Sequence, residues 1–160
     1  MHVEIETYAR ELQWILEQLV DALSGLTAAQ LNWRPSTGSA NSAYAIVGHV
    51  VASTRVYALG LGCGRRVARN RVEEFTGAGT DGGELVAAIR RLSGELDDAL
   101  ATLAPAALDR RRRPSQDLWG TGVPREISGR DALVESIRHA ALHLGELRLT
   151  RDLALSDASS

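Results

Sequence analysis

Apolar residues recur three and four positions apart along most of the chain, the spacing that places them on one face of a helix. Capping residues and helix breakers divide this pattern into four stretches of roughly twenty residues. We predict helices from 3 to 24, from Asn41 or Ser42 to about 61, from Asp81 to the residues before Pro105, and from Ser128 or Asp131 to about 155. Because no convincing run of alternating β-branched residues occurs, the pattern predicts an all-α fold, a four-helix bundle.

Two connections interrupt the helical pattern. Residues 26–39 contain turn-favouring residues and leave room for one short helical turn within LTAAQLNWRP. Residues 105–129 carry three prolines and four consecutive arginines, and such a long excursion is typical of a covering or functional loop. Since neither an internal repeat nor a second domain is evident, we expect a single domain over residues 1–155 and a C-terminal tail over 156–160.

The composition is that of an ordinary globular domain, and it argues against several classes of function. The chain has 160 residues, of which 44% are hydrophobic and 24% charged. A net charge of −2 gives no broad positive field, so we expect neither nucleic-acid binding nor attraction to acidic membranes. The longest uncharged apolar run, 42–54, is too short to span a bilayer. The single cysteine cannot close an intramolecular disulfide, and no signal-like segment opens the sequence, which favours a cytoplasmic location.

Three of the four histidines fall on the predicted apolar helix faces. His139 and His143 stand four residues apart in HAALH, so they lie on the same side of the fourth helix. The pattern places them in the middle of its apolar arc, which is bordered on one side by Leu142, Leu149 and Leu153. The third, His49, lies on the second helix among small residues that leave room around its ring: Ser42, Ala45, Ala52 and Ser53.

Three imidazoles directed into one bundle core need partners, because an unpaired buried polar group is costly. Each histidine taken alone is explained by a hydrogen bond within the core, whereas the three together favour a divalent metal. Three neutral imidazoles suit Zn²⁺, Ni²⁺, Fe²⁺ or Cu²⁺, so the ligand set does not identify the metal, and we expect Zn²⁺ or Ni²⁺. They leave one coordination position open, as in catalytic rather than structural zinc sites. Ala140 follows His139 where a zinc protease carries glutamate, so protease chemistry is disfavoured.

Three stretches of the sequence, LTAAQLNWRP, IVGHVVAS and IRHAALHLGELRLTRDL, together resemble the DinB-like superfamily, which includes the YfiT-like metal-dependent hydrolases. The resemblance implies an up-down-down-up bundle with a long crossover between the second and third helices. It also implies a metal triad formed by His49, His139 and His143. Similar members include transferases and isomerases that use low-molecular-weight thiols such as mycothiol and bacillithiol, beside many proteins without a known activity.

Two classes of function stay open under this resemblance. We expect a metal-dependent enzyme that acts on a small molecule, with thiol transfer ahead of hydrolysis and a low-molecular-weight thiol as cofactor. The metal would take the thiol sulfur as a thiolate and present it to an electrophile. The alternative is a non-catalytic, stress-associated metal-binding bundle. The sequence does not decide between a monomer and a homodimer formed through an uncovered helix face.

Six further residues are candidates for the site. The candidate catalytic residues are Ser53, Tyr57 and Glu146, the last of which stands where relatives often carry glutamine. The candidates for cofactor binding, all in the long loop, are Arg112, Arg113 and Trp119. Arginine can grip a carboxylate or phosphate, and tryptophan can cover a pocket. The alternatives are bundle contacts for the first group, and a solvated loop anchored by its tryptophan for the second.

Overall fold

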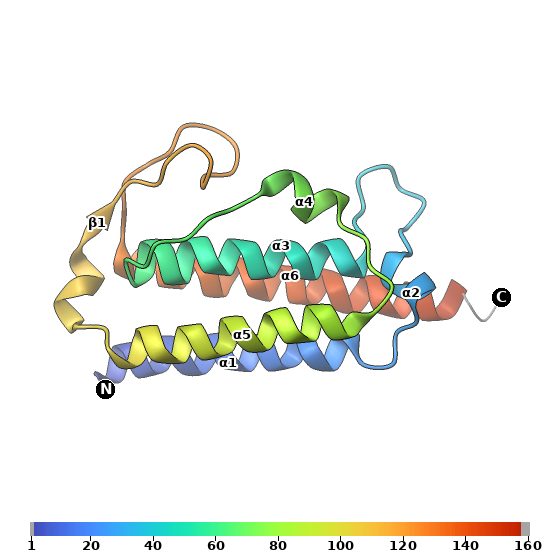
Figure 1. Cartoon of the computed structure of the whole chain (residues 1–160), viewed down its shortest axis with the longest axis horizontal. Helices are drawn as coiled ribbons and strands as arrows, with labels where there is room; N and C mark the ends of the chain where they lie inside the picture. Colours follow the sequence, from blue (N-terminus) through green and yellow to red (C-terminus); the bar gives the residue numbers. More distant parts are fainter. Residues whose placement is uncertain (1, 158–160) are drawn as a thin grey trace.

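Four long helices lie side by side, with short helices and loops around them (Figure 1). The computed structural model describes residues 2–157, with the backbone alone for residues 73, 75 and 76. Its helical elements are α1 (Val3–Leu23), α2 (Ala28–Asn32), α3 (Ala43–Thr54), η1 (Arg55–Gly62), α4 (Arg71–Thr76), α5 (Gly82–Ala101), η2 (Pro105–Asp109) and α6 (Gly129–Asp157). The strands β1 (Arg111–Arg112) and β2 (Ile127–Ser128) form one short antiparallel ladder. The chain is therefore mostly helical, in agreement with the all-α prediction.

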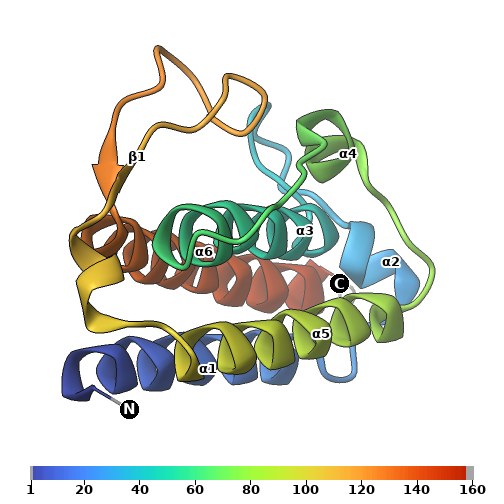
Figure 2. The ribbon, with the colours of Figure 1, turned by 60° about the vertical axis from the view of Figure 1, so that its left-hand side comes forward.

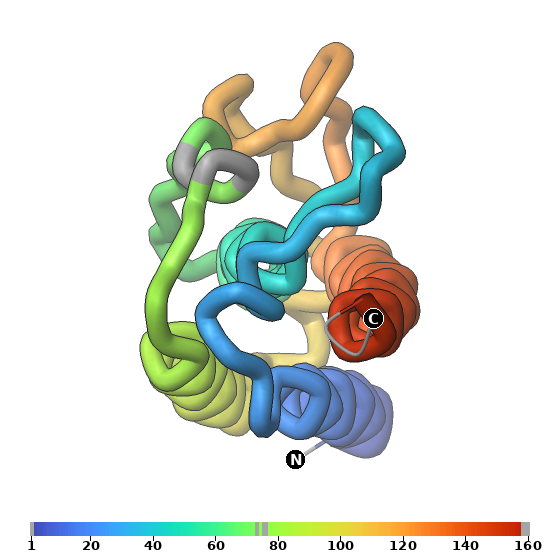
Figure 3. The backbone as a smooth tube through the Cα atoms, turned by 90° about the vertical axis from the view of Figure 1, so that its right-hand side faces the viewer, coloured from blue at the N-terminus to red at the C-terminus, as the bar shows by residue number. Residues whose placement is uncertain are grey.

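The apolar stripe of α1 packs against α5 and α6 and forms one side of the core. Ile5, Leu12 and Leu19 on this stripe are fully buried. At one end of the bundle, Arg130 Nε donates to Glu4 Oε1 at 2.6 Å and so joins the start of α6 to the start of α1. Figure 3, which looks along the bundle, shows that the segment between η1 and α5 and the segment between α5 and α6 both lie on the outer side of α3.

Helix α3 begins where the sequence indicated, because Ser42 caps it by accepting a hydrogen bond from Ala45 N at 3.2 Å. It continues directly into η1, a π-helix in which hydrogen bonds span five residues rather than four. Gly62 lets this end approach α6, since a Cβ there would lie 2.9 Å from Leu133 Cδ2. The helix stops before Gly64, whose φ of 74° suits glycine. The predicted second helix is thus confirmed in its extent.

The continuous helix Ala43–Gly62 is long and apolar enough to cross a membrane by length and composition, with a mean hydropathy of 1.3. The uncharged run 42–54 covers only part of this helix, which continues through Arg55 to Gly62. However, 67% of the stretch is buried inside the structure. Packing in the bundle core therefore accounts for its apolar composition.

Residues 63–81 form a crossover that runs along the outer side of α3, from the end of η1 to the start of α5 (Figures 1 and 2). This crossover carries α4, which packs on α3 and was not predicted. Its far end is fixed to α2, because Asn32 Nδ2 donates to Gly79 O at 2.7 Å and Asn32 Oδ1 accepts from Gly79 N at 3.3 Å. Helix α2 is the short turn expected within LTAAQLNWRP, and Thr27 and Gln30 close a capping box at its start.

The excursion between α5 and α6 is a loop closed at its base by the β1–β2 ladder. This pairing was not predicted, because two-residue strands leave no periodic pattern in a sequence. Within the loop, Leu118 and Trp119 pack against a small apolar cluster made of Val56, Leu61, Ile127 and Ala132. The loop therefore covers the η1 end of the second long helix, as its length had indicated.

Helix α6 buries a narrower face than its sequence predicts. Leu142 is 67%, Leu149 62% and Leu153 42% exposed, so these leucines do not border a buried arc. The two histidines of α6 lie at the edge of its buried stripe rather than in the middle. The helix continues to Asp157, two residues into the predicted tail, and residues 158–160 of that tail lie outside the described residues.

Candidate metal site

The structure brings His49, His139 and His143 together between α3 and α6. The ring centroids lie 5.0 Å apart for His49 and His139, 4.8 Å for His49 and His143, and 4.6 Å for His139 and His143. One potential ligand atom from each residue lies within 4.8 Å of the others, and the Nε2 atoms of His49 and His139 are 3.0 Å apart. His49 is buried, whereas His139 and His143 are half-buried. The convergence expected from the helix pattern is therefore present.

A carboxylate from the crossover holds the ring of His49. Glu74 Oε2 lies 2.9 Å from His49 Nδ1, and the Glu74 side chain is only 5% exposed. Arg69 grips the same carboxylate with two donors, Nε to Oε1 at 2.6 Å and Nη2 to Oε2 at 2.8 Å. Burial favours the neutral form of Glu74, but the hydrogen bonds from Arg69 and His49 outweigh burial and lower its pKa to about 2. At neutral pH Glu74 is therefore an ionised acceptor.

A second carboxylate holds the ring of His143. Glu146 Oε2 lies 2.6 Å from His143 Nδ1, and the two residues are three apart on α6. The Glu146 side chain is 38% exposed, so this pair faces solvent more than the Glu74–His49 pair does. Both carboxylates contact Nδ1, so Nε2 is the atom through which each of these two rings would bind a metal.

The residues present fit a divalent metal. Carboxylates commonly hold the second nitrogen of a metal-binding histidine and so orient its ring. Zn–N bonds of about 2.0–2.1 Å place the nitrogens of a tetrahedral site about 3.3 Å apart, so small side-chain rotations would close these rings on an ion. Burial, followed by the neighbouring His143 and His49, lowers the pKa of His139 to about 4. The ring of His139 is therefore neutral at neutral pH, as metal binding requires.

A pocket of about 360 Å³ opens beside the three histidines. Its remaining walls come from α3, η1, the crossover and the long loop: Ser53, Tyr57, Arg69, Arg71, Trp119, Gly120 and Thr121. The Tyr57 ring lies 6.2 Å from the Trp119 ring and 6.3 Å from the His139 ring, measured between centroids. Burial raises the pKa of Tyr57, so its hydroxyl stays neutral at neutral pH. A three-histidine centre would have its open position on this pocket.

The other predicted candidates divide into those near the site and those away from it. Ser53, Tyr57 and Trp119 line the pocket, although Ser53 Oγ donates to Val50 O at 3.1 Å. Glu146 contacts His143 and therefore acts on a ring rather than as a free acid or base. The remaining two, Arg112 and Arg113, are not among the residues found to line the pocket.

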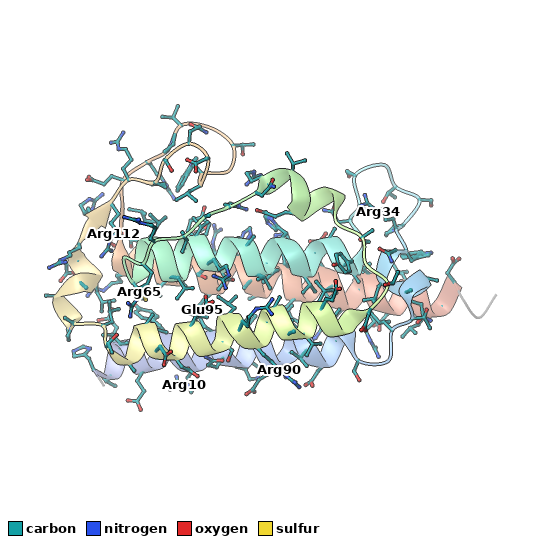
Figure 4. The ribbon with its side chains drawn as sticks, in the orientation of Figure 1. Arg10, Arg34, Arg65, Arg90, Glu95 and Arg112 are labelled. Atoms are coloured by element: carbon teal, nitrogen blue, oxygen red, sulfur yellow. The ribbon has the colours of Figure 1, made fainter. Side chains whose placement is uncertain are left out.

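Arg112 has a structural role at the η1 end of the bundle, where Figure 4 labels it. Its Nη1 donates to Leu61 O at 2.6 Å and contacts Gly62 O at 3.4 Å. Arg113 is exposed. Neither arginine is thus placed to bind a ligand beside the histidines.

The sequence interpretation missed Arg69 and Glu74. Both lie in the charged stretch RNRVEE, which carries no helical apolar period. The signal that could have found them is the density of charge in a connection next to a buried histidine, since buried histidines need polar partners. The sequence alone could not show that Glu74 is the partner of His49, because this depends on the path of the crossover.

The fold and site define a helical bundle with a three-histidine group able to hold a divalent metal. The family model of the DinB superfamily matches residues 11–147. The chain therefore belongs to the DinB superfamily, and the match spans all three histidines. A comparison with curated proteins found no match for the chain.

Proposed function

We propose that the chain binds a divalent metal, Zn²⁺ or Ni²⁺ first, at His49, His139 and His143, and that at this centre a low-molecular-weight thiol loses its proton and its sulfur bonds to a small electrophilic molecule. The observation that carries the proposal is the convergence of three histidine ligand atoms within 4.8 Å, with two of the rings held at Nδ1 by carboxylates. Membership of the DinB superfamily supports it. A thiol bound at the open position would ionise more readily there, because a metal ion stabilises the thiolate.

The residues around the pocket have separable roles in this proposal. Glu74 and Glu146 keep the Nε2 atoms of two rings available for the metal. Trp119 and Tyr57 form an aromatic wall that limits access of water to the open side. The neutral hydroxyl of Tyr57 can donate a hydrogen bond to a bound anion.

A non-catalytic metal-binding bundle is the second candidate. This candidate is supported by the lining of the pocket: among the described residues that line it there is no carboxylate to act as a base, and the nearby Glu146 is engaged with His143.

The same lining bears on the choice between thiol transfer and hydrolysis. A thiol transferase needs no carboxylate base, because the metal already favours the thiolate. Hydrolysis would profit from one, so this lining supports thiol transfer over hydrolysis.

Connectivity, location and partners are further parts of the proposal. We infer an up-down-down-up connectivity, which is supported by the lengthwise crossover and by the helix directions visible in the colours of Figure 1. We also propose a single domain acting in the cytoplasm on a small molecule, with no nucleic acid or membrane partner. The net charge of −2 and the burial of the most apolar helix support this.

Metal analysis of the purified protein tests the site. The wild type should carry stoichiometric divalent metal, and His139→Ala should carry close to none. His2→Ala is the matched control, since His2 is exposed at the start of the chain and far from the pocket in sequence. Undiminished metal in His139→Ala would remove the triad from consideration.

A thiol-transfer assay tests the activity. Glutathione, bacillithiol and mycothiol are each offered with a reactive electrophile, with and without a chelator. Thiol transfer predicts turnover with one of them that is lost on chelation and absent in His139→Ala. Stoichiometric metal without metal-dependent turnover on any thiol would favour the binding protein instead.

A further inference from the structure

We propose that Glu74 and Arg69 are a positioning pair that fixes His49 as a metal ligand, so that the crossover completes the metal site. The proposal rests on the metal site of the proposed function and adds to it two residues outside the triad. Both come from the connection between η1 and α5, and their side chains are only 5% and 3% exposed. Neither residue contacts the metal position in this assignment, because each acts through the ring of His49.

The contact of Glu74 determines which nitrogen of His49 carries the hydrogen and which carries the lone pair. Arg69 donates to both oxygens of Glu74, so the carboxylate faces His49 as an acceptor, and its contact with Nδ1 at 2.9 Å assigns the hydrogen of the His49 ring to Nδ1. The lone pair of His49 is then on Nε2, the atom that faces His139 Nε2 at 3.0 Å. Without this acceptor the ring can carry its hydrogen on Nε2 or rotate, and either change removes a ligand.

Arg69 keeps the carboxylate in place. Its two donors engage both oxygens of Glu74, and its Nη1 donates to Leu118 O at 3.2 Å. Arg69 therefore joins the crossover to the loop that carries Trp119. A buried ion pair is a poor way to stabilise a fold, since apolar residues of similar size often do as well or better. The position of the Arg69–Glu74 pair beside the ring of His49 is explained instead by the orientation that the pair imposes on this ring.

The pair on His143 provides an internal comparison. Glu146 contacts its histidine at a similar distance, 2.6 Å, but from the same helix and with a side chain 38% exposed. Water can replace an exposed acceptor more easily than a buried one. Loss of Glu74 should therefore weaken metal binding more than loss of Glu146.

The test measures the dissociation constant of Zn²⁺ by competition with a chelator. Removal of a residue that orients a metal ligand typically costs about 10–100-fold in affinity, and we expect a loss of this size for Glu74→Gln. Glu146→Gln should lose less. Glu95→Gln is the matched control, because Glu95 on α5, labelled in Figure 4, accepts from Arg55 on η1 at 2.7 Å in a half-exposed pair. We expect the affinity of this control to stay at the wild-type value.

Substitutions of Arg69 and a paired replacement separate positioning from folding. Arg69→Lys keeps a charged donor and should bind Zn²⁺ more tightly than Arg69→Met. The double variant Arg69→Met with Glu74→Met replaces the buried pair by apolar side chains, which should preserve the melting temperature. This variant should nevertheless lose about 10–100-fold in Zn²⁺ affinity, as we expect for Glu74→Gln, because it lacks the acceptor that orients His49.

Nitrogen-15 chemical shifts of His49 give a readout that needs no metal. In chelated wild-type protein at pH 8 they should show the hydrogen on Nδ1, and in the double variant a mixture of both tautomers. A folded double variant with wild-type Zn²⁺ affinity and an unchanged His49 tautomer would overturn the inference. Failure of the wild type to bind Zn²⁺ through its histidines would instead overturn the proposed function, while the His49 tautomer would still report on the role of Glu74.

Discussion

The two faces of the second long helix are built in different ways. Toward the core, Ile46, Val47 and Val50 are at most 2% exposed and pack within a large apolar cluster. Toward the crossover, the same helix presents His49 to a buried carboxylate and its arginine. Apolar contacts add up without strict geometry, whereas each buried polar group must find its own partner. The core face should therefore determine stability, and the crossover face should determine what the site can bind.

The largest expected effect lies on the core side. Leu96 on α5 is fully buried, and Leu96→Ala should lower the free energy of unfolding by about 3 kcal/mol because it leaves a cavity. Urea unfolding of chelated protein measures this change. Leu142→Ala is the control, because Leu142 is 67% exposed and its loss should cost less than about 0.5 kcal/mol. If the two faces are independent, Leu96→Ala keeps the full metal content of the wild type, and a loss of metal would show that they are coupled.

The next effect lies on the crossover side. Zn²⁺ at about 100 times its dissociation constant should add about 2.7 kcal/mol to the free energy of unfolding, since it binds the folded chain. Leu96→Ala should gain the same increment, and His139→Ala should gain none. Thermal unfolding with and without Zn²⁺ measures both. An equal gain in His139→Ala would place the binding of Zn²⁺ elsewhere.

A smaller effect follows from the pKa of His139, which burial and the neighbouring histidines lower from 6.5 to about 4. In this pH range the unfolded chain binds a proton that the folded chain does not, so acid favours unfolding. The stability of metal-free protein should be unaffected by this group above pH 6.5 and should fall as the pH drops toward 4. Urea unfolding at pH 7 and pH 5 should show a smaller loss for His139→Gln than for the wild type. Equal losses would contradict a lowered pKa for His139.

The smallest effect concerns the surface. Arg130 joins α6 to α1 through Glu4, at 40% and 30% side-chain exposure, and its hydrogen bond to Glu4 lowers the pKa of that carboxyl. Arg130→Gln should lower the unfolding midpoint less than Leu96→Ala or the loss of the bound metal does, because water and salt screen exposed pairs. The difference from the wild type should shrink further in about 1 M salt. A difference that persists in salt would show that this contact stabilises the fold as a buried contact does, without screening by solvent.

The four long helices and the three histidines could be predicted from the sequence, because apolar period and side-chain spacing survive in any packed helix. The buried width of α6 could not, since Leu142 and Leu149 continue the apolar arc although neighbouring helices do not cover them. The role of Glu74 could not be predicted from the sequence for a different reason. It is 25 residues from His49 in sequence, and only the path of the crossover brings them together.

The β1–β2 ladder has a consequence beyond the site. It pairs Arg111 with Ser128 and Arg112 with Ile127, so residues 113–126 leave and rejoin the bundle at one point. Because the ladder fixes both ends, we expect the exposed part of this segment to tolerate changes of length and sequence without displacing the helices that carry the histidines. Trp119, Gly120 and Thr121 belong to this segment and line the pocket, so the sequence of the loop determines part of the pocket wall. Grafting other loops onto the same ladder is a direct route to altering which small molecules the pocket admits.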